Sequence, residues 1–263
     1  MADDDRWMRF DPYVPVGERR FNAARHAAKL AKQGRVLDPV VANLRGRSLA
    51  GTFWGRAWCD NLAAYAALAN RLDRGRSYLR GGHVIDLQIE AGRVTALVSG
   101  TEIYEIGVTI KPIPRQRWKA VVKACAGKID SVVELLAGRF DESVMREVCR
   151  QGTGLFPSPE EISYRCTCPD GLRGNWLCKH VAATLYGVGV RLDEDPEMLF
   201  RLRKVAHGEL LARATARLAD DVAPRRSVRR AIADGRLSAV FGIDLEHAPA
   251  PRARRPRRPL RSS

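Results

Sequence analysis

Four residues with soft ligand atoms stand close together in the second half of the sequence. Cys166 and Cys168 are separated by one residue, and Cys178 and His180 are separated by one residue after a gap of nine. A tetrahedral zinc ion takes four ligands, and two pairs joined by a loop supply two corners each. The spacing therefore predicts one structural Zn²⁺ held by these four side chains. A set of four protein ligands leaves no open position for water or substrate, so the site does not indicate an enzyme.

Two other interpretations of the cluster stay open on the residues alone. The four side chains could be ordinary buried groups, or Cys166 and Cys168 could form a redox pair, although they lack the Cys-x-x-Cys spacing typical of thioredoxin-like sites. A distant side chain could also replace one ligand, the available ones being Cys59, Cys149, His83 and His207. The two local pairs already supply the four ligands that a tetrahedral zinc ion takes.

The segments around the four residues predict a strand, a loop and a helix. "EISYR" before the first pair has strand character, and residues 169–171 ("PDG") favour a turn. The run from Lys179 predicts a helix whose N-terminus lies near Cys178, where the helix dipole favours a thiolate. Three thiolates around a dication leave a net negative charge, which we expect Arg165, Arg173 and Lys179 to offset.

The remaining cysteines and the N-terminus indicate the compartment. Cys59, Cys125 and Cys149 sit on apolar faces of expected helices, so we predict buried thiols that act as small hydrophobic groups. The first residues, "MADDDRWMRF", are acidic where a secretory signal would be basic, and no window approaches about 18 apolar residues. We expect a soluble cytoplasmic chain with no membrane partner.

Hydrophobic periodicity predicts the elements that must position the cluster. Residues 83–110 alternate with period two and predict a three-stranded antiparallel meander; the inward residues are Ile85, Leu87, Ile89, Val94, Ala96, Val98, Tyr104, Ile106, Val108 and Ile110. An aromatic stripe of Trp54, Trp58, Leu62, Tyr65 and Leu72 predicts a helix over 53–72. Further helices are expected over 21–33, 115–127, 129–140, 141–152, 193–205 and 208–219, with a helix and short strand over 228–245.

These elements predict an α+β fold. We expect a small antiparallel β-meander packed with helices and a ββα-like zinc knuckle docked on C-terminal helices. The expected regions are an N-terminal arm (1–52), an α+β body (53–150), the zinc finger with its following helix (155–205), a helical C-terminal region (206–247) and a disordered basic tail (248–263). At 263 residues the chain can bury a sizeable core.

A net charge of +15 points toward polyanions as partners. The segment 71–82 could form a glycine-containing loop that presents arginines to phosphates with Tyr78 available for stacking, but a solvated turn is the favoured alternative, because loops are commonly charged. The last 13 residues, "PRARRPRRPLRSS", contain six arginines and no acid. The predicted phosphate contacts are Arg71, Arg74, Arg76, Arg80, Lys179, Arg252, Arg254, Arg255, Arg257 and Arg258.

Several catalytic classes lack their signatures. The sequence contains no G-x-x-x-x-G-K-[ST], no G-x-S-x-G and no H-E-x-x-H, which argues against a phosphate-loop ATPase, a serine hydrolase and a zincin. We therefore expect no enzymatic activity, and any ATP-driven work would belong to a partner.

The C-x-C-x9-C-x-H arrangement resembles the SWIM zinc finger, and all four ligand positions match. The similarity continues through "TFWGRAWCDNL", "GLFPSPEEI", "CKHVAATLYGVG" and "RLDEDPEMLFRLR", which resemble successive blocks of bacterial SWIM zinc finger proteins over about residues 52–204. The resemblance implies a DNA-binding or protein-interaction module, and a partner of the Swi/Snf-type helicase-like ATPase class. The first fifty residues and the tail lie outside it.

Two functions from different classes follow. The first is a DNA-binding accessory factor in which the basic segments hold phosphates while the zinc-stabilised surface orients the contact. The second is an adaptor that binds a helicase-like partner through the finger and makes no direct contact with nucleic acid. Salt-dependent DNA binding separates them, because neutralising phosphates gives a steep salt dependence.

Overall fold

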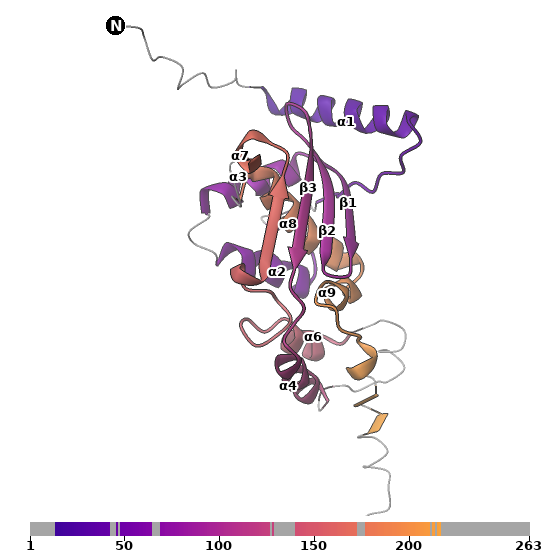
Figure 1. Ribbon diagram of the computed structural model, residues 1–263, viewed down its shortest axis with the longest axis vertical. Coiled ribbons are helices and arrows are strands. Elements are labelled where there is room, and N and C mark those ends of the chain that lie inside the picture. Colours follow the sequence, from indigo (N-terminus) through magenta and orange to yellow (C-terminus); the bar gives the residue numbers. More distant parts are fainter. Residues whose placement is uncertain are drawn as a thin grey trace, which may run out of the picture. The chain divides into compact units, whose positions relative to one another are not determined.

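Figure 1 shows the computed structural model, which describes residues 14–42, 46, 48–64, 69–126, 128, 140–172, 177–210, 212, 213, 215 and 216. The chain divides into two units, Met1–Asp220 and Asp221–Ser263, and every described residue lies in the first. The expected helix over 129–140, the elements over 228–245 and the basic tail fall on residues outside the described part, apart from position 140. The domain boundaries given above stay a prediction.

A four-stranded antiparallel sheet forms the centre of the first unit. Its strands are β1 (Val84–Glu90), β2 (Arg93–Ser99), β3 (Ile103–Ile110) and β4 (Ile162–Cys166). They lie in sequence order, so each strand pairs with the next. The meander predicted over residues 83–110 is confirmed, and the strand that leads into the finger joins it as the fourth. The finger and the body therefore share one sheet.

Alternation along the strands gives the sheet one buried face. Val94, Val98 and Val108 are fully buried on this face, as the period-two pattern predicts. Ile85 departs from the pattern because a bulge between Val84 and Asp86 places one extra residue in β1. Ile85 consequently packs in a second, smaller cluster instead of the main core.

The described part of the chain also contains helices, and the one that packs along the sheet is α8 (Lys179–Glu194). Their bounds are α1 (Val16–Lys32), α2 (Phe53–Ala63), α3 (Ala69–Arg80), α4 (Arg115–Cys125), α6 (Glu142–Val148), the 3-10 helix η3 (Pro159–Glu161), α7 (Pro169–Leu172), α8 (Lys179–Glu194) and α9 (Glu197–Leu202). The described helices include none with the length and apolar character needed to cross a bilayer. The chain is thus α+β, as predicted.

Helix α8 is the core helix, and its central position explains its composition. Every residue from His180 to Leu192 is buried. Figure 1 shows α8 behind the sheet, where it packs against α2, α3 and all four strands. A helix that is apolar on most sides has to be enclosed. The same helix that carries a candidate zinc ligand therefore organises the core.

The segment between residues 53 and 80 forms two helices, not the single helix and basic loop expected from sequence. Helix α2 ends at Ala63, and the stripe residue Tyr65 lies outside the described residues. Residues 69–80 are helical because Leu72 and Leu79 are buried and α3 packs closely against α8. Tyr78 is buried as well, so it does not offer an open ring for stacking.

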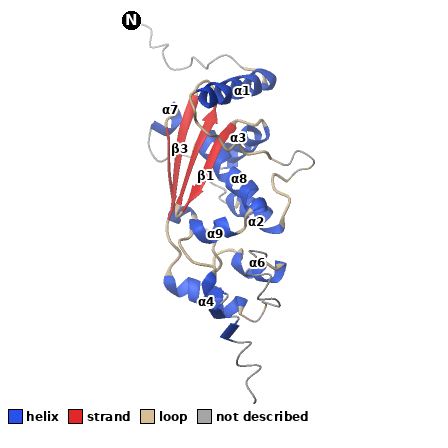
Figure 2. Cartoon of the chain, turned by 90° about the vertical axis from the view of Figure 1, so that its right-hand side faces the viewer, coloured by secondary structure: helices blue, strands red, loops and turns tan. Residues whose placement is uncertain are grey.

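Helix α1 lies at one end of the sheet (Figure 2), where it packs against the face opposite α8. It begins at Val16, five residues before the expected start at Phe21. Ala23 of this helix packs with Ile85 and Leu97 in the second hydrophobic cluster. The rest of that sheet face carries polar side chains.

A buried ion-pair network secures the segments that lead into β4 and out of α9. Glu161 accepts hydrogen bonds from Arg117 on α4 at 2.9 Å and from Arg203 at 2.8 Å. Arg203 is fully buried, and it also donates to the Lys111 carbonyl oxygen. Charges of this kind are tolerated inside a protein only when they are paired and hydrogen-bonded.

Candidate metal centre

The four residues singled out by their spacing meet in space. The Sγ atoms of Cys166, Cys168 and Cys178 and a ring nitrogen of His180 all lie within 4.8 Å of one another, and all four residues are buried. His180 Nδ1 is 3.8 Å from Cys166 Sγ and 3.9 Å from Cys178 Sγ. Ligands about 2.0–2.3 Å from a tetrahedral zinc ion are separated by roughly 3.5–3.8 Å. The donor set and its spacing fit zinc.

The first pair is positioned by the end of β4 and the turn after it. Cys166 is paired with Ile106 in the sheet and points to the buried face, and the Gly171 N–H donates to Cys168 Sγ at 3.3 Å. A Cβ atom at Gly171 would collide with the Cys166 carbonyl oxygen. The turn predicted from residues 169–171 is thus the short helix α7, and only glycine fits at its third position.

The second pair begins helix α8. Cys178 is the N-cap of α8, and its Sγ accepts the Val181 N–H at 3.5 Å. A hydrogen bond from Cys166 and further hydrogen bonds from His180 and Val181 lower the pKa of Cys178 to about 3. Donating that hydrogen bond, together with burial, raises the pKa of Cys166. The arrangement supports a thiolate at Cys178, as the predicted helix start requires.

Two tyrosine rings hold the His180 imidazole in place. Tyr104 from β3 stacks on it with ring centroids 4.4 Å apart, and Tyr78 from α3 meets it edge-on at 5.3 Å. With Nδ1 toward the thiols, Nε2 is buried and has no hydrogen-bond partner in the described part of the chain. The ring orientation therefore depends on packing. Neither tyrosine was predicted to contact the site, because both contacts join segments distant in sequence.

The other thiols do not join the cluster. Cys59, Cys125 and Cys149 are buried as predicted, and burial raises the pKa of Cys59 and of Cys125 to about 12 and that of Cys149 further still. Neutral thiols of this kind behave as small hydrophobic groups. Among the described residues, neither these cysteines nor His83 or His207 belong to the metal-binding group.

The three basic residues expected to offset the thiolates do not all lie beside the metal centre. Arg165 directly precedes Cys166 in β4, so the two side chains point to opposite faces of the sheet. The Arg165 guanidinium lies over Gly107. The prediction that it offsets the thiolates is wrong, because neighbouring residues of a strand face opposite sides. Arg173 lies outside the described residues. Lys179 places its Nζ 5.1 Å from the centre of the Tyr78 ring, beside the metal centre.

The four arginines of α3 have different surroundings. Arg71 forms an ion pair with Asp170 at 3.4 Å, Arg74 is exposed, and Arg76 lies over the Tyr186 ring. Arg80 donates to the Gly46 carbonyl oxygen at 2.9 Å, and its own carbonyl accepts from Arg20 at 3.4 Å. The predicted contacts in the tail, from Arg252 to Arg258, lie outside the described residues.

Helix α1 adds two cations that sequence reasoning did not assign to a site. The Arg19 guanidinium lies 5.9 Å from the Tyr78 ring centre, and Arg20 reaches the end of α3. We call Arg19, Arg20, Arg80 and Lys179 the Tyr78 surface. The basic composition of α1 was visible in the sequence, but its position beside the finger was not.

Comparisons with known proteins agree with the geometry. The family model for the SWIM zinc finger matches residues 159–187. The chain is 36% identical over 192 residues to the uncharacterized protein Rv2102 of Mycobacterium tuberculosis, an alignment that covers 71% of this chain and 68% of the relative. No solved structure matches the chain significantly. With its C-x-C-x9-C-x-H ligand set and one structural zinc ion, the chain belongs to the SWIM zinc finger family.

Proposed function

We propose that this protein is a DNA-binding accessory factor whose zinc finger holds a basic surface in position for the phosphate backbone. The observation that supports the proposal is the Tyr78 surface, where cations from α1, α3 and α8 gather beside the metal centre. Lys179 and Arg19 both lie over the Tyr78 ring, which in turn contacts the ring of His180. A zinc ion bound by His180 would therefore help to hold the Tyr78 ring, and the cations beside it, in position.

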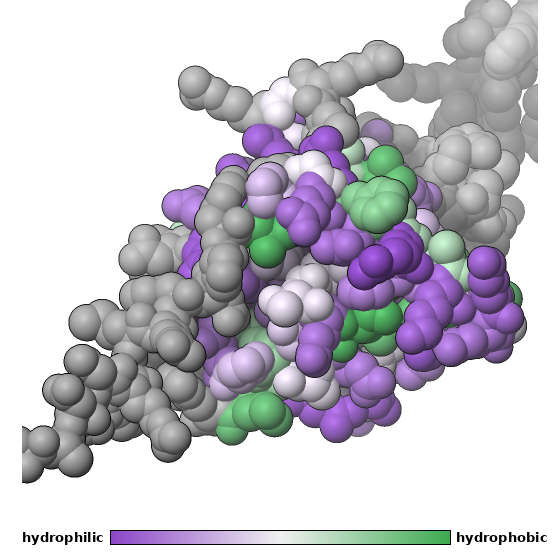
Figure 3. Space-filling view, turned by 90° about the horizontal axis from the view of Figure 1, so that it is seen from above, coloured by the Kyte–Doolittle hydropathy of each residue, from purple (hydrophilic) through white to green (hydrophobic). Residues whose placement is uncertain are grey.

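The position of Lys179 adds to the attraction for anions. It is the first residue of the 16-residue helix α8, and a helix N-terminus carries partial positive charge. Viewed from the α1 end, the described surface is largely hydrophilic, with separate hydrophobic spots (Figure 3). A polar, cationic surface suits a phosphate backbone better than an apolar protein partner.

In this proposal the finger has a binding role and the protein is not an enzyme. Three thiolates and one imidazole would complete the coordination of zinc, which would then supply structural stability without activating a water molecule. We propose that a Swi/Snf-type helicase-like ATPase provides the ATP-driven work and that the pair acts in the cytoplasm. The adaptor function is the alternative if DNA binding fails.

DNA affinity measured over a range of salt concentrations tests the proposal. We expect zinc-loaded protein to bind duplex DNA with a log-log salt slope of about −0.9 for each phosphate contact. The Arg80→Gln/Lys179→Gln double variant should bind more weakly and lose up to about 1.8 from the slope. Both side chains reach the surface, so this variant should fold and retain its zinc.

The matched control is the Arg56→Gln/Arg115→Gln double variant. It removes the same charge from two exposed positions on α2 and α4, outside the Tyr78 surface. We expect its DNA affinity to stay close to that of the wild type. Equal effects of the two double variants would show that only net charge matters, and absence of DNA binding by the wild type would leave the adaptor function.

A further inference from the structure

We propose that the open face of the sheet is a second binding surface, which takes the backbone of a single-stranded nucleic acid. The inference rests on the proposed function, because it assumes that this protein meets DNA. This binding surface is separate from the Tyr78 surface and shares no residue with it. The face is the one opposite α8, and within the described part of the chain α1 packs against one end of it.

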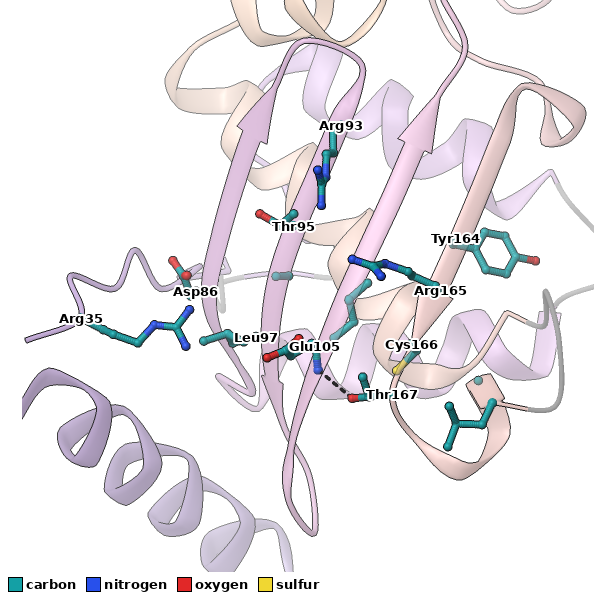
Figure 4. Close-up of a pocket in the computed structure, with 14 residues that line it drawn as sticks. Arg35, Asp86, Arg93, Thr95, Leu97, Glu105, Tyr164, Arg165, Cys166 and Thr167 are labelled. Carbon is teal, nitrogen blue, oxygen red and sulfur yellow. Dashed lines mark hydrogen bonds between the residues drawn. The ribbon is translucent and has the colours of Figure 1, made fainter. Parts of the chain in front are cut away.

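A groove of about 600 Å³ lies along this face (Figure 4). Its floor is formed by the strands, and its ends are formed by Arg35 after α1 and by Leu172 of α7. A smaller hollow of about 350 Å³ shares Arg93 and Arg165 with it. Clefts of about 300–1,000 Å³ accommodate small organic molecules, so the groove has room for roughly one or two nucleotides.

Two guanidiniums converge in this groove. Arg93 stands on β2 and Arg165 on β4, two strands apart, which corresponds to about 10 Å. Figure 4 shows the Arg165 side chain extending across β3 toward β2, with the Arg93 guanidinium in the same space. Both residues are exposed, and neither side chain has an ion pair or hydrogen bond with any described residue. Their hydrogen-bonding groups are available to a ligand.

Gly107 of β3 makes this convergence possible. It is paired with Arg165 in the sheet register, and a Cβ atom at Gly107 would lie 2.8 Å from Arg165 Nε. The missing side chain allows the arginine to lie flat over the central strand. Arginine is suited to phosphate because its planar fork donates two parallel hydrogen bonds to one group.

The other groups in the groove favour a nucleotide over a simple anion. Hydroxyl groups of Thr109 and Ser163 stand opposite each other beside the two arginines and supply further donors for phosphate oxygens. Glu105, toward the α1 end, is exposed and offers acceptor oxygens. Carboxylates accept hydrogen bonds from base amino groups and sugar hydroxyls. Phosphate-binding groups and an acceptor thus lie in one groove.

The shape of the groove selects a single strand over a duplex. Its volume of about 600 Å³ matches one or two nucleotides of a single strand, which can lay its backbone along the strands of the sheet. Guanidinium planes also stack on unpaired bases, which a duplex does not expose.

Binding of a fluorescent oligothymidylate, measured by anisotropy at several salt concentrations, tests the inference. We expect the Arg93→Gln/Arg165→Gln double variant to bind roughly tenfold more weakly at low salt and to lose about 1.4 from the salt slope, or about 0.7 for each contact. Its affinity for duplex DNA should change much less. Zinc content and the thermal unfolding midpoint of the variant check that the fold is intact.

The Arg56→Gln/Arg115→Gln variant is again the control for net charge. Unchanged oligothymidylate binding by the sheet variant would overturn the inference, as would equal losses for duplex and single strand, or binding of polyglutamate in place of the oligonucleotide. If the sheet variant is normal while Arg80→Gln/Lys179→Gln loses duplex binding, the inference is wrong and the proposed function stands. If the wild type binds neither form of DNA, the proposed function itself is wrong.

Discussion

Cys166 Sγ and His180 Nδ1 lie 3.8 Å apart and connect the last residue of β4 to the first turn of α8. These two elements belong to the sheet and to the core helix, which pack against each other. A zinc ion bound between them links the two layers of the fold. Binding energy of a structural zinc is folding energy in such modules, so the metal should stabilise the core as well as the finger.

The remaining cysteines should be irrelevant to the metal. Cys125→Ala and Cys149→Ala remove small buried groups, so each should lower the free energy of unfolding by about 1–3 kcal/mol. Zinc content should stay at that of the wild type, since neither thiol belongs to the metal-binding group. Metal analysis together with urea unfolding checks both effects. A variant of either residue that binds no zinc would show that the ligand set is misassigned.

Tyr104 should act on the metal centre through the His180 ring. Its ring stacks on the imidazole at 4.4 Å, so Tyr104→Ala removes the support that orients Nδ1 toward the thiols. We expect zinc affinity to fall roughly tenfold, in the range seen when groups that orient a metal ligand are removed. Competition with a chromogenic chelator measures this. Tyr104→Phe keeps the stacked ring and should bind zinc as the wild type does.

Acid should weaken the buried network around Glu161. Burial raises the pKa of Glu161, but hydrogen bonds from Arg203, the Ser158 N–H and Arg117 outweigh it, so the folded-state pKa lies below the usual 4.5. A depressed carboxyl pKa contributes stability above the unfolded-state value, and this stability is lost as pH falls through the folded-state value.

The corresponding variant is Glu161→Gln, which leaves the fully buried Arg203 without its carboxylate partner. Breaking a buried ion pair costs about 3–5 kcal/mol. We expect that loss at pH 7. The gap in stability between variant and wild type should narrow as pH falls below about 4.5, because the unfolded wild-type chain then binds a proton at this carboxyl while the folded chain, with its lower pKa, does not. Urea unfolding at pH 7 and pH 4 measures it. A gap that stays constant with pH would contradict the assigned role.

The C-terminal arginines should add electrostatic affinity without sequence preference. Ending the chain after Ala250 removes six arginines and no acid, which takes the net charge from +15 to +9. The salt slope on duplex DNA should fall by about 0.9 for every phosphate that the shortened chain no longer binds, with a limit of roughly five if all six arginines bind. Affinities on two unrelated sequences should fall equally, because phosphate contacts do not read bases. An unchanged salt slope would show that the C-terminal arginines do not contact DNA.

The zinc ligands were predictable because they are local. Two pairs within fifteen residues carry their own geometry, and the alternation in residues 83–110 likewise lies within one continuous segment. The helix over residues 69–80 was not predicted, because its glycine and its many arginines favour a loop unless α8 is there to bury Leu72 and Leu79. The groove was missed for a similar reason. Arg93 and Arg165 meet only through the register of β3 with β4, strands separated by more than 50 residues.

Metal analysis of the purified protein beside a Cys178→Ser variant tests the central claim most directly. Cys178 supplies one corner of the site and caps α8, so its replacement should leave three ligands and weaken the centre. The predicted result is about one zinc per chain in the wild type and much less in the variant, which should also unfold at a lower temperature. Full zinc retention by the Cys178→Ser variant, or a wild type that carries no zinc, would contradict the account.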